Sequence, residues 1–382
     1  MRQRLIYLLK HNAFVQRLYR VVMSFVFRVY GCFLPTQDDL VLFVSFMGMG
    51  FNDSPKAIYD FMQQHPQYGG YRCVWAFEHP EKYPELETVK IDTLRYFQTA
   101  LRAKYWITNT NIERGLRFKK KNQVYLNTWH GIALKHIGND CPGRKDFNFD
   151  TVDHLVVSGD YDETVFRSAF RAREHTYLRC GMPRNEPLWS AGANSKQTAR
   201  QKLGLPPEKT VILYAPTWRD STDGGKSYAI CPPVHFEAWR KALGEGYVVL
   251  FRAHHQTTKV LGVKFDDFVL DVSGYPEVND LMLASDLLIT DYSAIAFDYS
   301  ILCRPIFCYA YDYDSYLVSR GTYFEVDERY PNKSCRTEEE LLARIQSMDR
   351  AAECANTKRF RDRFIQYGPG ATQACVRAEF GR

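Results

Sequence analysis

Short apolar runs alternate with helical or polar stretches along this chain, and this alternation most constrains its fold. The runs predicted as strands are residues 40–46, 71–77, 105–108, 124–127, 154–158, 210–215, 247–253, 268–271, 286–290 and 305–309. Strands that alternate with helix-length segments are typical of βαβ units, and such units build parallel sheets. We therefore predict an α/β fold in which two Rossmann-like domains, with five strands each, face a cleft.

The break between the two series of strands is rich in small residues and prolines. Residues 190–195 are small or polar, and residues 204–207 end in a proline pair. A chain of 382 residues is long enough for two domains. We expect one domain over residues 37–195 and a second over 196–345, followed by helices over 346–382 that could pack back on the first domain.

The positive charge of the chain is concentrated at its start. Residues 1–36 contain six of the 50 Lys and Arg residues and no acid, so the remaining 44 cations balance 44 acids. A formally neutral body disfavours nucleic-acid binding, which needs a basic face.

Apolar residues interleave with these cations at roughly helical spacing, and no apolar run reaches the roughly 20 residues that span a bilayer. We predict that residues 1–36 form an interfacial helix or helix pair on an anionic cytoplasmic membrane surface. A helix packed on the body is the alternative. Arg17, Arg20 and Arg28 argue against a signal peptide, because they interrupt its apolar core.

Cofactor motifs are weak in this chain. The ten cysteines are scattered without a C-x-x-C pair, which is typical of buried thiols in a reducing compartment, and no metal site is predicted. The Gly48-Met49-Gly50 segment follows a strand but lacks the third glycine of a dinucleotide fingerprint, and there is no Walker motif. We expect no resident cofactor, although a divalent cation could arrive with a diphosphate substrate.

Polar side chains follow the predicted strand at residues 286–290. Thr290, Asp291 and Ser293 stand at its end, and a helical pattern that contains Asp298 comes next. In open parallel sheets ligands bind beyond the carboxyl ends of the strands, and the N–H groups that open a helix bind phosphate. We predict a nucleotide-phosphate site here, with an ion pair as the alternative role of Asp298.

A histidine follows the predicted strand at residues 124–127. The sequence there reads Thr128-Trp129-His130-Gly131, and an imidazole at a strand end is placed to deprotonate a substrate hydroxyl. The glycine permits a sharp turn or a close approach to a ligand. The alternative is a buried histidine satisfied by a hydrogen bond.

Other strand ends and turns carry cations suited to a diphosphate. Thr217 and Arg219 end the first strand of the second domain, and Arg252 and His254 end the next on the same side. Arg184 follows a turn near the domain boundary. Each arginine could instead be solvated or paired with an acid.

Together these segments resemble the CDP-glycerol glycerophosphotransferase family, which includes the teichoic acid primases and polymerases. The resemblance spans about residues 125–325 and rests on the blocks at 128–131, 215–219, 252–254, 271–281, 290–298, 309–312 and 320–323.

The resemblance implies a GT-B architecture in which the second domain holds the donor. It implies transfer of a polyol phosphate from a CDP-activated donor to a hydroxyl, with release of CMP. His130 matches the histidine proposed as the base, and His254 matches a second histidine suited to the donor diphosphate. The family positions at or near the donor contacts correspond to Arg184, Thr217, Arg252, Ser293 and Asp298.

The chain departs from the family pattern at several positions. Ile132 and Ala133 stand where the family often has Thr and Pro, Ala253 stands where it often has Pro, and Ala294 replaces a second serine. Since both histidines are kept, these changes bear on the polyol accepted more than on the chemistry.

The sequence thus predicts a peripheral membrane transferase on the cytoplasmic face. It would move glycerol phosphate, or a related polyol phosphate, to a membrane-linked saccharide or polymer in teichoic-acid-like or capsule synthesis. The alternatives are a GT-B glycosyltransferase that uses a sugar nucleotide, and a non-catalytic cell-envelope assembly protein with the same fold. The polyol, the acceptor and the oligomeric state do not follow from the sequence.

Overall fold

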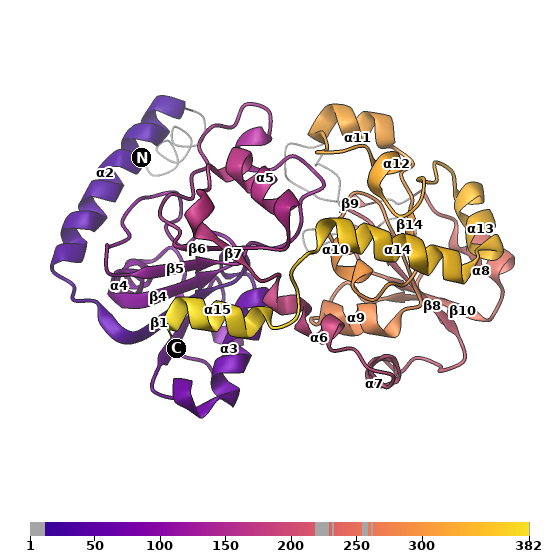
Figure 1. The fold of residues 1–382 in the computed structure, drawn as a ribbon, viewed down its shortest axis with the longest axis horizontal. Helices are drawn as coiled ribbons and strands as arrows, with labels where there is room; N and C mark the ends of the chain where they lie inside the picture. The colour runs from indigo at the N-terminus through magenta and orange to yellow at the C-terminus, as the bar shows by residue number, and fades with distance from the viewer. Residues whose placement is uncertain (1–11, 218–228, 231–232, 254–258, 261–262, 382) are drawn as a thin grey trace.

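The protein has two lobes, each built around a parallel β-sheet (Figure 1). The computed structural model describes residues 12–217, 229–230, 233–253, 259–260 and 263–381. Most of the longer strands in both large sheets are apolar over much of their length, because helices cover both faces of such sheets.

The first lobe contains a seven-stranded sheet in the order β3-β2-β1-β4-β5-β6-β7, and every pairing is parallel. The strands are β1 (Gln37–Val44), β2 (Arg72–Phe77), β3 (Thr88–Lys90), β4 (Ala103–Thr108), β5 (Val124–Asn127), β6 (His154–Val157) and β7 (Tyr177–Arg179). The sequence predicted five of them. It missed β3 and β7, because three residues are too few to show a periodic pattern.

The second lobe contains a five-stranded parallel sheet in the order β12-β10-β8-β13-β14. These strands are β8 (Thr210–Ala215), β10 (Tyr247–Phe251), β12 (Val269–Asp271), β13 (Leu287–Thr290) and β14 (Ile306–Cys308), and a separate pair joins β9 (Ala229–Ile230) to β11 (Lys259–Val260). All five strands of the larger sheet were predicted. In both lobes the chain runs from the central strand outward to one edge and then returns to the other side, as in Rossmann folds. The predicted α/β class with two Rossmann-like lobes is confirmed.

Helices cover these sheets (Figure 1). The first lobe carries α2 (Ala13–Cys32), α3 (Asp53–Gln64), α4 (Leu94–Arg102) and α5 (Asp160–Phe170), and α6 (Glu186–Trp189) and α7 (Ser195–Lys202) lead into the second lobe. The second lobe carries α8 (Phe236–Leu243), α9 (Val278–Ala284), α10 (Ile295–Ser300), α11 (Tyr313–Arg320), α12 (Val326–Arg329) and α13 (Glu338–Ser347). The chain then continues into α14 (Arg350–Phe364) and α15 (Ala371–Phe380).

The last two helices lie on different lobes. In α14, Phe360 and Phe364 pack on Phe297 of α10, with ring centroids 5.1 Å apart in both pairs. In α15, the buried Cys375 and Val376 join the core beneath α3 and the first sheet. Figure 1 shows both helices in yellow, one on each lobe. The end of the chain therefore ties the two lobes together.

The helix α2 presents two different faces. Its N-terminus is capped by the Asn12 side chain, which accepts hydrogen bonds from the first backbone N–H groups. Phe27 is buried and stacks on Phe97 of α4 at 4.4 Å. The opposite face is apolar and exposed, with Phe14, Leu18, Val21, Val22, Phe25, Val26, Val29 and Phe33. Within the described part of the chain, no helix has the length and apolar character needed to cross a membrane.

Candidate active site

A cavity of about 1440 Å³ lies between the two lobes. Its wall includes Trp129 and His130 beyond the end of β5, Thr217 beyond β8, Arg252 beyond β10 and Ser293 beyond β13. The carboxyl ends of strands from both sheets thus meet at one cavity, which is where parallel α/β sheets bind ligands.

His130 is held in a defined orientation on the first-lobe side. Its Nδ1 lies 2.8 Å from the backbone oxygen of Asn109. A carbonyl oxygen only accepts, so Nδ1 carries the proton in the neutral ring and Nε2 carries the lone pair. Trp129, whose φ is +51°, lies against the imidazole at 4.0 Å and packs on Phe170 at 4.5 Å. This tautomer is the one that a general base needs.

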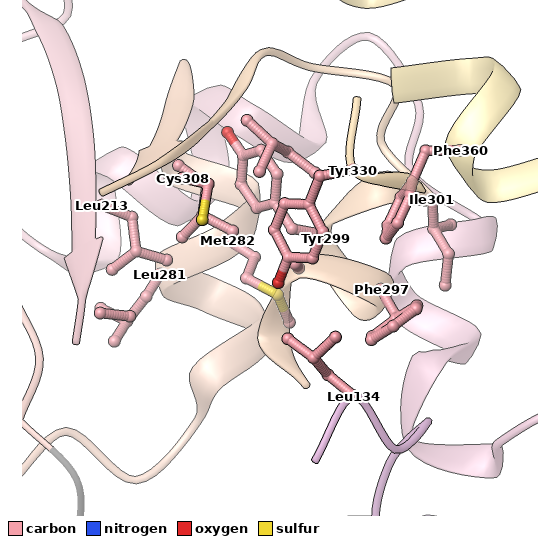
Figure 2. Close-up of a cluster of buried hydrophobic side chains, with 14 of the residues drawn as sticks. Leu134, Leu213, Leu281, Met282, Phe297, Tyr299, Ile301, Cys308, Tyr330 and Phe360 are labelled. Atoms are coloured by element: carbon pink, nitrogen blue, oxygen red, sulfur yellow. The ribbon is translucent and has the colours of Figure 1, made fainter. Parts of the chain in front are cut away.

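The segment after His130 crosses into the second lobe. Leu134 is 2% exposed and belongs to the second-lobe core. Figure 2 shows its side chain pointing toward that cluster from a separate segment of the chain. The backbone N–H of Tyr323 donates to the Leu134 oxygen at 2.9 Å, and that of His136 donates to the Gly321 oxygen at 3.3 Å. His130 is therefore positioned by both lobes.

At Gly131 the first lobe closely approaches the second. Its φ is +143°, and a Cβ placed there would lie 2.9 Å from the Cβ of Ala294 and 3.3 Å from Nη2 of Arg184. A side chain at position 131 would push the lobes apart, which explains the glycine.

Arg184 joins the two lobes through buried charges. It lies in the 3-10 turn Pro183–Asn185, its Nη1 donates to Asp53 at 2.7 Å and to the His130 oxygen at 2.9 Å, and its Nη2 donates to Asp298 at 2.7 Å. Asn185 donates to the other oxygen of Asp298 at 2.7 Å. The alternative that Asp298 forms an ion pair is the one observed, and Arg184 is not a solvated surface residue.

Burial and ion pairing oppose each other in this network. Burial raises the pKa of Asp298, and the Arg184 charge only partly opposes it. For Asp53 the cation and several hydrogen bonds outweigh burial, so its pKa is lowered. Nearby Asp162 is buried with one carboxylate oxygen lacking a hydrogen-bond partner, and burial raises its pKa to about 7, helped by the Asp298 charge.

The second-lobe side of the cavity carries polar side chains at strand ends. Thr217, Arg252 and Ser293 all line it. Nη1 of Arg252 donates to the backbone oxygens of Val272 at 3.1 Å and Tyr275 at 2.8 Å, so this arginine fixes the loop after β12. Among the described acids, neither Asp271 nor any other forms an ion pair with it. Burial lowers its pKa, but a guanidinium stays cationic at neutral pH.

Three predicted contact residues lie behind the cavity wall. Thr128 and Thr290 are buried and donate to backbone oxygens, Thr290 to that of Ala215 at 2.8 Å. Asp291 is buried, and its Oδ1 accepts the backbone N–H of Thr217 at 2.9 Å. Polar groups at these strand ends satisfy the buried backbone and support the wall. The predicted substrate contacts of these three residues stay predictions.

Two predicted site residues, Arg219 and His254, fall outside the described residues. The sequence reading also missed Asp53, which lines the cavity at the start of α3. Its only local signal was its place three residues after the Gly48-Met49-Gly50 segment. Its partner Arg184 lies far away in the sequence, which is why the contact was not foreseen.

Comparison with known proteins decides the family. Residues 26–377 match the model of the family described as CDP-Glycerol:Poly(glycerophosphate) glycerophosphotransferase. The chain belongs to this family of transferases. The resemblance predicted from the sequence is therefore confirmed.

Individual relatives agree with this assignment. The chain is 37% identical over 354 residues to a teichoic acid poly(glycerol phosphate) polymerase of Staphylococcus epidermidis, a match that covers 86% of this chain but 48% of the relative. It is 33% identical to a teichoic acid glycerol-phosphate transferase of Staphylococcus aureus, covering 84% and 86% of the two chains. The solved wall teichoic acid polymerase TagF superimposes with a TM-score of 0.80 at 32% identity, over 98% of this chain and 95% of that one. The GT-B architecture expected from the resemblance is confirmed by this match.

Proposed function

We propose that this protein transfers glycerol phosphate from CDP-glycerol to a hydroxyl of a teichoic-acid-type acceptor and releases CMP. The observation that carries the proposal is that one cavity is lined both by His130, whose Nδ1 is held by the Asn109 carbonyl, and by Arg252 of the second lobe. Family membership supports CDP-glycerol as the donor, and so does the solved structure of a TagF variant that was soaked with CDPG.

In the proposed mechanism His130 removes the proton of the acceptor hydroxyl through Nε2. The acceptor oxygen attacks the phosphorus that bears the glycerol, a new P–O bond forms, and the bond to the CMP oxygen breaks. CMP leaves with the bonding electron pair, and Arg252 stabilises the charge on its phosphate. We assign the second histidine role to His254 by family resemblance alone.

The lobes have separate roles in this proposal. We assign acceptor binding to residues 37–195, which supply His130, and donor binding to residues 196–345, which supply Thr217, Arg252 and Ser293. Residues 346–382 would hold the two lobes in a fixed relative position, because α14 and α15 pack on different lobes.

A donor panel tests the activity. Purified protein is incubated with acceptor and CDP-glycerol, CDP-ribitol or UDP-sugars, and the products are identified by mass. Release of CMP from CDP-glycerol is expected. Turnover of a UDP-sugar would instead show a glycosyltransferase, and nucleotide binding without turnover would show an assembly protein.

His130→Ala tests the base. We expect kcat to fall on the order of 10²-fold or more, since a positioned base contributes about that much. His79→Ala is the matched control, because that histidine pairs with Glu81 on the surface. Wild-type turnover by purified His130→Ala would overturn the assignment.

We further propose that the exposed apolar face of α2 binds the membrane surface peripherally. Its side chains share one side of the helix, and Arg17 on the same helix favours an anionic surface. Because Phe27 packs on α4, surface substitutions are a cleaner test than deletion of the helix.

Phe14→Ser with Phe25→Ser is the variant of choice. Each buried aromatic side chain contributes at least about 1.5 kcal/mol, so losing both should weaken binding to anionic vesicles by roughly 100-fold. Phe265→Ser, an exposed apolar residue on the second lobe, is the control. Equal vesicle binding by all three proteins in a sedimentation assay would refute the proposal.

A further inference from the structure

Two buried asparagines stand at the ends of neighbouring strands in the first sheet. Asn109 follows β4 and Asn127 is the last residue of β5, and these two strands pair in parallel. Both asparagines are 0% exposed, and neither lines the cavity. A buried amide needs hydrogen-bond partners within the protein, because an unsatisfied polar group is costly there. The partners of these two amides lie in the segments that form the cavity wall around His130.

Each asparagine holds an aromatic residue in the left-handed backbone conformation. Oδ1 of Asn109 accepts the backbone N–H of Phe46 at 2.8 Å, and Oδ1 of Asn127 accepts that of Trp129 at 2.8 Å. The φ angles of Phe46 and Trp129 are +43° and +51°. Residues other than glycine rarely adopt such angles, and they keep them only where the surrounding structure holds them. The two amides therefore fix backbone conformations that both aromatic residues would otherwise leave.

The amide nitrogens join the same segments from the other side. Nδ2 of Asn127 donates to the backbone oxygen of Thr110 at 2.7 Å, and the Thr110 hydroxyl accepts the backbone N–H of Met47 at 3.2 Å. Nδ2 of Asn109 donates to the Ser45 hydroxyl at 3.4 Å. The segment after β1 is thus tied to the ends of β4 and β5 through these two side chains.

Both of the aromatic rings lie against the imidazole of His130. The centroid distance is 5.6 Å for Phe46 and 4.0 Å for Trp129, and both rings line the cavity. The backbone oxygen of Asn109 lies 2.8 Å from Nδ1 of the imidazole. The torsion that turns such a ring is roughly two-fold, so a flipped imidazole would bring Nε2 to this oxygen instead. Packing by the two aromatic rings opposes that flip.

We infer that Asn109 and Asn127 are positioning residues for His130. Each acts through the aromatic residue that it holds, and together they keep Nε2 of the imidazole as the atom that takes the proton of the acceptor hydroxyl. The inference rests on the proposed function, in which His130 is the base. A ring that flips or tilts no longer presents this lone pair to the acceptor in the reactive geometry, so turnover falls.

The test compares Asn109→Ala and Asn127→Ala with the matched control Gln123→Ala. Gln123 is a buried amide immediately before β5, at the opposite end of that strand from Asn127. Its Nε2 donates to the backbone oxygens of Ala100 at 2.7 Å and Ala103 at 2.6 Å, so its loss also removes buried hydrogen bonds. We expect kcat of both asparagine variants to fall on the order of tenfold below that of the control, because the base is misplaced. The KM for CDP-glycerol should stay near wild type, since we assign donor binding to the second lobe.

Nitrogen NMR of the full chain with isotope-labelled histidine reports the state of the imidazole directly. The His130 signals are identified by their loss in His130→Ala. We expect the wild type to show the tautomer with the proton on Nδ1, and both asparagine variants to show a mixture with the other tautomer. Phe46→Leu should change the same signals. It leaves both asparagines in place, so it keeps the test decisive if the alanine variants fold poorly.

The two measurements together decide the inference. A kcat below that of Gln123→Ala, combined with altered His130 signals, supports it. A kcat equal to that of the control in both asparagine variants overturns it, and so do His130 signals that match the wild type in both of them and in Phe46→Leu. If the wild type releases no CMP from CDP-glycerol, the proposed function fails, whereas the NMR signals still decide whether the two asparagines position the imidazole.

Discussion

The buried charges around Arg184 give the sharpest test of how the lobes are held together. Arg184→Met removes one cation and leaves two carboxyl groups, Asp53 and Asp298, whose side chains are only 8% and 12% exposed. Removing one member of a buried ion pair costs about 3–5 kcal/mol, because the other charge stays buried without a partner. We therefore expect the free energy of unfolding at pH 8 to fall by about 3–5 kcal/mol, a large share of the roughly 5–15 kcal/mol typical of folded proteins.

This loss should depend on pH. Without the cation, burial raises the pKa of both carboxyl groups above their unfolded values. Between the unfolded and folded pKa values the native state holds a proton that the unfolded chain has released, so stability falls as pH rises. The deficit of Arg184→Met relative to wild type should thus be smaller at pH 5 than at pH 8.

Urea denaturation at both pH values measures the deficit. Tryptophan fluorescence follows unfolding of both lobes, since buried tryptophans lie in the first lobe (Trp106) and in the second (Trp239). Arg72→Met is the control, because its ion pair is exposed and should contribute less than about 1 kcal/mol. Adding Asp298→Asn to Arg184→Met should restore part of the loss. Equal midpoints for the Arg72 and Arg184 variants at pH 8, or a deficit that is the same at both pH values, would show the reasoning to be wrong.

Three further predictions concern single residues. Asp162→Asn should become more stable than wild type as pH rises from about 4 to 7. The folded pKa of about 7 means that ionising the buried carboxyl of the wild type costs about 1.4 kcal/mol per pKa unit. Urea titrations across this pH range measure the difference in the free energy of unfolding, and parallel pH profiles of the two proteins would contradict the prediction. Gly131→Ala should lower the free energy of unfolding by roughly 1–3 kcal/mol and also lower turnover, because the new Cβ meets Ala294. Gly143→Ala is the control, since Gly143 also has a positive φ but a Cβ there would meet no neighbouring atom. Equal losses in the two variants would contradict the steric explanation. Asp291→Ala should raise the KM for CDP-glycerol by about tenfold with little change in the acceptor KM, since the loop after β8 loses a hydrogen-bond acceptor. Steady-state kinetics with each substrate varied in turn measure both KM values, and a rise confined to the acceptor KM would contradict the prediction.

Much of the fold was predictable because a strand buried in a parallel sheet shows its burial in its own short run of apolar residues. Strands such as β8 and β13 are apolar over their whole length, and polar residues begin where each strand ends. Parallel connectivity then places those ends along one edge of each sheet, so His130 and Arg252 were predicted at the cleft, and both line the cavity. Short edge strands such as β3 left no such pattern.

The roles of site residues were harder to predict where polar side chains form hydrogen bonds with the protein's own backbone. Thr290 and Asp291 stand at the right strand end, but their side chains hydrogen-bond buried backbone groups. A sequence shows that a polar residue lies at a strand end. It does not show whether the partner of that residue is a ligand or the backbone of the next strand.

The sequence by itself determined the two series of parallel strands, the family and the histidine at the end of β5, because each depends on residues close together along the chain. Only the tertiary structure decided that Asp53 meets Arg184, that Leu134 enters the core of the second lobe, and that Lys135 lies beside the end of α11. These contacts join segments more than 100 residues apart. The first forms within the first lobe, and the other two form through packing of one lobe on the other. Local periodicity reports which face of an element is buried, but not what it is buried against.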